Sequence, residues 1–104
     1  MIRAVFRKSG GSWLGFKVSG HAGQARRGRD LVCAAVTSAV RLTECQLNDV
    51  LGLGFHSTVD EKGAGIEIIS EKVHPSAQAA IGALYLYFTE LKSEYPGCIE
   101  VLEV

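Results

Sequence analysis

The stretch SWLGFKVSGHAGQARRGRDLVCAAVTSAV, residues 12–40, changes its hydrophobic period part-way along, and this change decides the fold. Its first part alternates between two faces, with Leu14, Phe16 and Val18 on one and Trp13, Gly15, Lys17 and Ser19 on the other. From Asp30 onwards, apolar residues recur at steps of three and four. Alternation is typical of a strand, and the longer steps are typical of an amphipathic helix. The stretch therefore predicts a strand, a loop rich in glycine and arginine, and a helix.

The flanking residues extend this pattern in both directions. Residues 2–7 alternate like a strand, and Ser9-Gly10-Gly11-Ser12 is a turn signal that joins them to the next strand as an antiparallel hairpin. The helix is expected to continue as far as Gly52. Asp30 is expected to be its N-cap, because a short acceptor side chain can bind the free amides of the first turn.

The second half of the chain repeats this order of elements with different residues. Strands are predicted at 55–60 and 65–70, a helix from Pro75 to about Glu94, and a last strand at 98–104. The order β-β-α-β-β-α-β predicts an α+β fold, a two-layer sandwich in which two helices pack on a mainly antiparallel sheet. We expect residues 1–104 to form a single domain.

Composition narrows the classes of protein to consider. The chain is 47% hydrophobic and 21% charged, which is typical of a globular protein and not of a disordered one. Eleven basic residues balance eleven acidic ones, which argues against direct DNA binding through many phosphate contacts. Because we find no apolar run of bilayer length and no secretory signal, we expect no membrane association and a cytoplasmic location.

Three cysteines, Cys33, Cys45 and Cys98, are odd in number and widely spaced, which favours reduced thiols over a disulfide framework. Cys33 is expected in the first turn of the first long helix. Free amides and the positive end of the helix dipole meet there, and both favour a nucleophilic thiolate. The same amides could stabilise an oxyanion. From position alone, a buried packing role for Cys33 is equally compatible with the sequence.

His21 stands at the end of the second predicted strand, before the loop that leads to Cys33. An imidazole brought next to the thiol could act as general base and then as general acid. Gly20, Gly23 and Gly28 would let the loop bend. The alternative is an ordinary polar residue in a turn. No histidine or cysteine pair has the spacing of a zinc site, so we expect neither a metal nor another cofactor.

Two segments, Gly20-His21-Ala22 and Gly28-x-Asp30-x-Val32-Cys33-Ala34-Ala35-Val36, resemble the signature of the bacterial ribosomal-processing cysteine proteases, the Prp family. The order of elements and the chain length also match, so the resemblance covers essentially the whole chain. The family commonly has serine where this chain has Thr37. The resemblance implies a cysteine endopeptidase that removes the N-terminal extension of a large-subunit ribosomal protein after aromatic residues, during ribosome assembly.

By position, the resemblance makes Cys33 the nucleophile and His21 the proton donor and general base. It also implies a homodimer and a mobile loop that contains Gly20, Gly23 and Gly28. Asp30 is either the helix cap or a residue that orients His21. An alternative of a different class is a non-catalytic, ribosome-associated adaptor that binds RNA or protein through three arginines of the loop, Arg26, Arg27 and Arg29.

Overall fold

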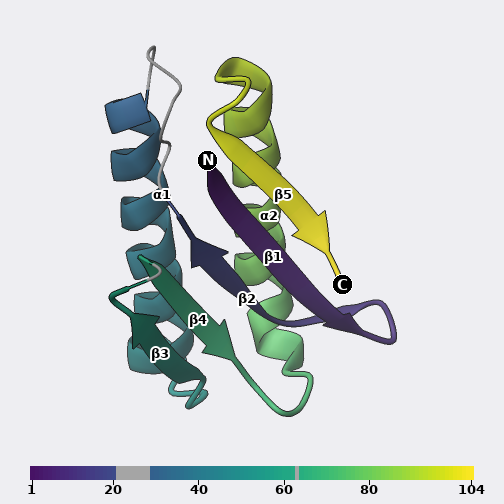
Figure 1. The fold of residues 1–104 in the computed structure, drawn as a ribbon. Coiled ribbons are helices and arrows are strands. Elements are labelled where there is room, and N and C mark those ends of the chain that lie inside the picture. The colour runs from purple at the N-terminus through teal and green to yellow at the C-terminus, as the bar shows by residue number, and fades with distance from the viewer. Residues whose placement is uncertain (21–28, 63) are drawn as a thin grey trace.

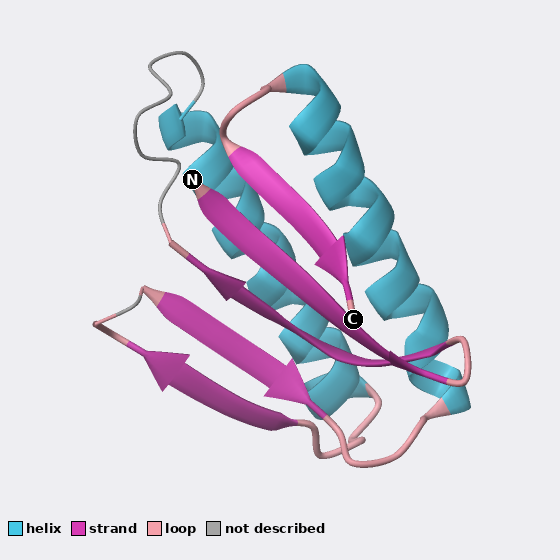
Figure 2. Ribbon diagram, turned by 45° about the vertical axis from the view of Figure 1, so that its right-hand side comes forward, coloured by secondary structure: helices cyan, strands magenta, loops and turns pink. Residues whose placement is uncertain are grey.

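Five strands form one mixed sheet in the order β3-β4-β2-β1-β5, and two long helices cover one of its faces (Figure 1). The computed structural model describes residues 1–20, 31–62 and 64–104, together with the backbone of residues 29 and 30. Neighbouring strands are antiparallel except for β1 and β5, which are parallel. Both views show the helices on the same side of the sheet (Figure 2). The predicted α+β sandwich and its order of elements are confirmed.

The elements follow the predicted segments closely. The strands are β1 (Ile2–Ser9), β2 (Ser12–Ser19), β3 (His56–Asp60), β4 (Gly65–Ile69) and β5 (Ile99–Glu103). The long helices are α1 (Arg29–Glu44) and α2 (Gln78–Glu94). A π-helical segment, Cys45–Val50, follows α1, and a 3₁₀ turn, Pro75–Ala77, precedes α2. No helix in the described part of the chain is long and apolar enough to span a membrane.

The core lies between the sheet and the two helices, where alternate strand residues meet helix residues at steps of three and four. Phe6, Phe16 and Ile68 are buried on the sheet side. They face two sets of buried helix residues, Val32, Val36 and Val40 from α1, and Ile81, Leu84 and Phe88 from α2. Burial of this apolar surface is the main force that holds each helix against the sheet.

Trp13 lies on the helix side of the sheet, so the prediction that it faces away from Phe16 is wrong. The register between β1 and β2 shifts at this point, since Arg7 pairs with Gly15 but Lys8 pairs with Trp13. The shift turns the indole towards Phe6 and Tyr85, with ring centroids 5.6 and 5.1 Å away. A bulge of this kind reverses the alternation that a regular strand would keep.

The first long helix also differs from its prediction at both ends. Its first residue is Arg29, so Asp30 is the second residue of α1. The Asp30 side chain lies outside the described residues, so its capping role stays a prediction. At the other end α1 stops at Glu44, and the π-helical segment follows it. There the Asn48 amide bonds both the N–H and the C=O of Phe55, at 2.7 and 3.0 Å, and so fixes the start of β3.

A small polar network joins α2 to β5 and gives a testable pH effect. The Tyr85 hydroxyl donates to the Glu103 carboxylate at 2.8 Å, and the Lys8 ammonium lies 2.9 Å from the same carboxylate. The hydrogen bond from Lys8, and then that from Tyr85, lowers the pKa of Glu103. The hydrogen bond to Glu103 is the main cause that raises the pKa of Tyr85 above 10.0.

Replacing Glu103 with glutamine is expected to bring the pKa of Tyr85 back down towards 10.0. The phenol then loses a charged acceptor that favours its protonated form. In the wild type, the stabilising contribution of the phenol is present below pH 10.0 and is lost as the pH rises through the raised pKa. A titration of Tyr85 by NMR measures the shift, and Glu100→Gln, on the same strand but paired with Arg3, is the control. An unchanged Tyr85 titration in Glu103→Gln would contradict the assignment.

Candidate active site

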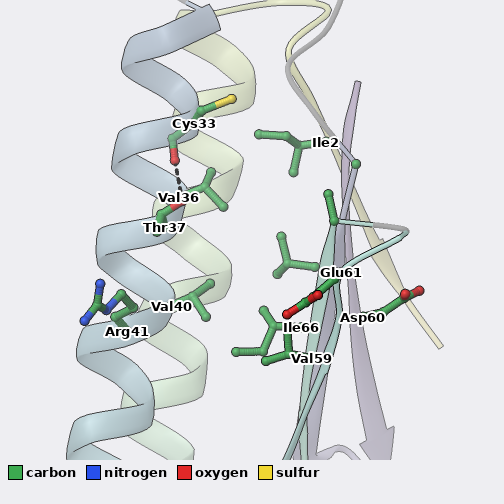
Figure 3. Close-up of a pocket in the computed structure, with 14 residues that line it drawn as sticks. Ile2, Cys33, Val36, Thr37, Val40, Arg41, Val59, Asp60, Glu61 and Ile66 are labelled. Carbon is green, nitrogen blue, oxygen red and sulfur yellow. Dashed lines mark hydrogen bonds between the residues drawn. The ribbon is translucent and has the colours of Figure 1, made fainter.

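A cavity of about 450 Å³ opens between α1 and the part of the sheet formed by β2, β4 and the end of β3 (Figure 3). Its walls are mainly aliphatic, with Val36 and Val40 on the helix side and Val59 and Ile66 on the sheet side. Arg41 and Glu61 supply charged side chains beside it. Asp60 is also a lining residue, but Figure 3 shows its carboxylate turned away from α1. The cavity therefore suits an apolar ligand group, with polar groups available beside it.

Cys33 lines this cavity, and it is the one cysteine among the described lining residues. The side chain is half-buried and packs against the core, whereas Cys45 is exposed and Cys98 is buried. None of the three cysteines forms a disulfide. Figure 3 shows the Cys33 sulfur on the side of α1 that faces the sheet. Among the three cysteines, the structure thus distinguishes Cys33 as the one beside a ligand-sized space.

The backbone position of Cys33 differs from the prediction. Because α1 begins at Arg29, Cys33 is its fifth residue and stands at the start of the second turn. The amide of a fifth helical residue donates within the helix, so the free amides belong to the residues before it. The Cys33 carbonyl accepts a hydrogen bond from the Thr37 hydroxyl at 2.8 Å. Thr37, which stands where the resembling family commonly has serine, is thus tied to the backbone of Cys33.

Gly20, at the end of β2, also lines the cavity, and two constraints require glycine there. Its φ is +87°, and a Cβ atom would lie 2.6 Å from the Met1 carbonyl oxygen. A side chain would therefore be strained and would clash with backbone. This close approach holds the backbone at the end of β2 against the start of β1.

The other predicted site residues of the loop lie outside the described residues. They are His21, Gly23 and Gly28. The remaining histidines are elsewhere: the His74 ring lies 3.1 Å from the Ser70 hydroxyl and packs on Phe55, and His56 is exposed on β3. Within the described ranges, no group of three or more His, Cys, Asp or Glu side chains could hold a metal ion.

Several lining residues were missed by sequence reasoning, namely Val59, Glu61 and Ile66 on the β3–β4 hairpin. The hairpin reaches Cys33 through strand pairing between distant segments, which local periodicity does not reveal. The only sequence signal was weak: Val59 is an apolar residue between the polar residues Thr58 and Asp60. The structure adds that Val59 is 65% exposed.

A half-buried thiol on the inner face of a helix, beside an apolar cavity in an α+β sandwich, fits a cysteine peptidase. The profile of one family, described as cysteine protease Prp, matches residues 1–100. The chain belongs to the cysteine protease Prp family, a family of peptidases. No curated protein matches the chain in sequence.

Solved structures have the same fold over the full length of this chain. SMU.848 from Streptococcus mutans is 25% identical with a TM-score of 0.87, over 100% of this chain and 94% of its own. The ribosomal processing protease Prp from S. aureus, solved with a substrate peptide, is 18% identical with a TM-score of 0.88, and both chains are covered completely. The same S. aureus protease with a covalently linked product peptide is 19% identical, with a TM-score of 0.83 and complete coverage of both chains.

Proposed function

We propose that this protein is an endopeptidase that removes the N-terminal extension of a large-subunit ribosomal protein during ribosome assembly. The observation that carries the proposal is the position of Cys33, a free thiol in the lining of the apolar cavity. Membership of the cysteine protease Prp family supports the reaction type. The S. aureus member is described as a ribosomal processing protease, which supports the choice of substrate.

In the proposed mechanism Cys33 is the nucleophile and His21 transfers the protons. The imidazole takes the thiol proton, and the thiolate sulfur attacks the scissile carbonyl carbon. The tetrahedral intermediate collapses, the C–N bond breaks, and the imidazolium gives its proton to the leaving amine. Water, deprotonated by the imidazole, then attacks the thioester and releases the acid, and the thiol is restored. Backbone amides that precede Cys33 in α1 are the proposed donors to the oxyanion.

The proposed substrate segment carries an aromatic residue on the N-terminal side of the scissile bond. The aliphatic walls formed by Val36, Val40 and Ile66 support this choice, because an aromatic ring gains most from burial in such a space. Arg41 and Glu61 would then contact polar groups of the same segment.

The remaining roles complete the proposal. Asp30 orients His21, and Gly23 and Gly28 let the loop close over the substrate. The protein acts as a homodimer in the cytoplasm, where cysteines that form no disulfide, as in this chain, are the rule. The adaptor alternative rests on Arg26, Arg27 and Arg29, whose side chains lie outside the described residues, and membership of a protease family favours the endopeptidase.

Incubation of the protein with the unprocessed ribosomal protein tests this function. We expect the precursor to lose a mass equal to that of its N-terminal extension, measured by mass spectrometry of the intact product. A precursor whose aromatic residues at the junction are replaced with alanine is the control and should remain uncut. A wild-type precursor that stays intact, whether or not it binds, would contradict the proposal and favour the adaptor.

A further inference from the structure

The outer edge of β3 is an open sheet edge next to the cavity that contains Cys33. All residues of β3, from His56 to Asp60, are exposed. β3 stands at the end of the strand order and pairs only with β4 within residues 1–20, 29–62 and 64–104. An open edge presents unpaired backbone N–H and C=O groups, which an extended polypeptide can bind as an additional strand.

The register of the sheet shows which backbone groups of β4 point towards β3. The Ser70 amide donates to the Leu14 carbonyl at 3.0 Å, so residue 70 directs its backbone groups towards β2. The paired residues continue from there, Ile69 with Gly15 and then Ile68 with Phe16. In an antiparallel pair, hydrogen-bonded and non-hydrogen-bonded positions alternate. The backbone groups of residues 66 and 68 of β4 therefore form hydrogen bonds with β2. Those of residues 65, 67 and 69 point towards β3.

The same alternation identifies the free groups of β3. His56, Thr58 and Asp60 pair with residues 69, 67 and 65 and so direct their N–H and C=O groups towards β4. Ser57 and Val59 alternate with them and direct both groups to the open edge. The open edge thus offers two N–H donors and two C=O acceptors, spaced as a regular strand requires.

The side chains of Ser57 and Val59 lie on the helix side of the sheet. Val59 lines the cavity, and the Ser57 hydroxyl donates to the Glu44 carboxylate at the end of α1. Residues directly opposite each other in a ladder place their side chains on the same face. A strand added at Val59 would therefore point its opposite residue towards the cavity.

We propose that the substrate binds as an extended strand that pairs with Ser57 and Val59 at the open edge of β3. The inference rests on the proposed function and adds how the substrate is held. Continuity favours the substrate over a second copy of the chain, because β3 ends at Asp60, and Asp60 and Glu61 line the same cavity as Cys33. Backbone pairing holds any extended sequence, and the cavity then selects the side chain that enters it.

Hydrogen exchange of the β3 amides tests this pairing directly. The probe is a peptide that carries the junction between the extension and the mature ribosomal protein, added to Cys33→Ala protein so that it is not cut. The amides of Ser57 and Val59 should exchange quickly in the free protein and at least about tenfold more slowly with peptide. The Thr58 amide, which faces β4, is the internal control and should change little.

Two substitutions at Ser57 give a kinetic test with a matched control. Ser57→Pro removes the outward N–H, and an edge strand tolerates proline where the N–H faces solvent. Ser57→Ala keeps that N–H and removes only the bond to Glu44. We expect kcat/KM for the junction peptide to fall about tenfold further in Ser57→Pro than in Ser57→Ala. If the proline variant does not fold, the exchange measurement decides.

The outcomes separate this inference from the proposed function. If wild-type protein cuts the peptide but the Ser57 and Val59 amides are not slowed, edge pairing is wrong and the endopeptidase stands. If they are slowed but wild-type protein does not cut, edge pairing stands and the endopeptidase is wrong. Slowing that depends on protein concentration without peptide indicates pairing between two copies and overturns the inference. If the peptide is neither bound nor cut, both the edge pairing and the endopeptidase are wrong.

Discussion

Replacing Cys33 with alanine is expected to lower kcat/KM for precursor cleavage by about 10⁴-fold or more. Alanine leaves no atom that can form the thioester, so only transition-state stabilisation by the remaining groups survives. The fold should persist, because alanine is a good helix former and Cys33 is only half-buried within α1. Initial rates of precursor cleavage, together with the thermal midpoint of each variant, measure both effects.

The controls for this prediction come from the chain itself. Cys45→Ala removes an exposed thiol that does not line the cavity and should cleave at the wild-type rate. His21→Ala should lose activity to a similar extent, and the double variant should be no worse than Cys33→Ala, because residues that act as a unit are not additive. Wild-type cleavage by Cys33→Ala would show that the thiol is not the nucleophile.

Local periodicity was sufficient to predict the order of elements, because each element of this fold carries its own period. Phe16 and Val18 alternate in β2, and Val32, Val36 and Val40 recur along α1, and all five are buried as expected. The prediction failed where pairing between strands decides orientation. The orientation of Trp13 is set by the register shift between Arg7 and Lys8. This shift depends on the partner strand, so the periodicity of β2 does not predict it.

The candidate site could be predicted only in part for the same reason. Cys33 could be predicted as a candidate site residue from its position in the first long helix, and the structure adds that it faces a cavity. The opposite wall comes from Val59 and Ile66, which meet α1 because β4 pairs with β2. That pairing joins segments about 50 residues apart in the chain, for example Ile66 with Val18. Contacts between such distant segments are set by topology, and a single sequence shows them only weakly.

Replacing Phe6 with alanine is expected to reduce the free energy of unfolding by about 4 kcal/mol. Phe6 is fully buried at the centre of an aromatic cluster. Its ring centroid lies 5.3–5.9 Å from those of four other rings, Trp13, Phe16, Tyr85 and Phe88. Its removal leaves a cavity between β1 and α2 that the rigid neighbouring rings can fill only in part. In a domain of this size, each kcal/mol of lost unfolding free energy lowers the thermal midpoint by about 4–8 °C. The expected fall in the thermal midpoint of Phe6→Ala is therefore large.

Tyr87→Ala is the matched control for Phe6, because it removes another aromatic ring at a site that is 39% exposed. A ring that is already partly in water loses less on removal, so we expect a cost of about 1 kcal/mol or less. Denaturant unfolding should show a lower midpoint with an unchanged slope for Phe6→Ala. Phe6 does not line the Cys33 cavity, so cleavage should persist below its melting temperature. Equal losses of stability in the two variants would contradict the central place of Phe6 in the core.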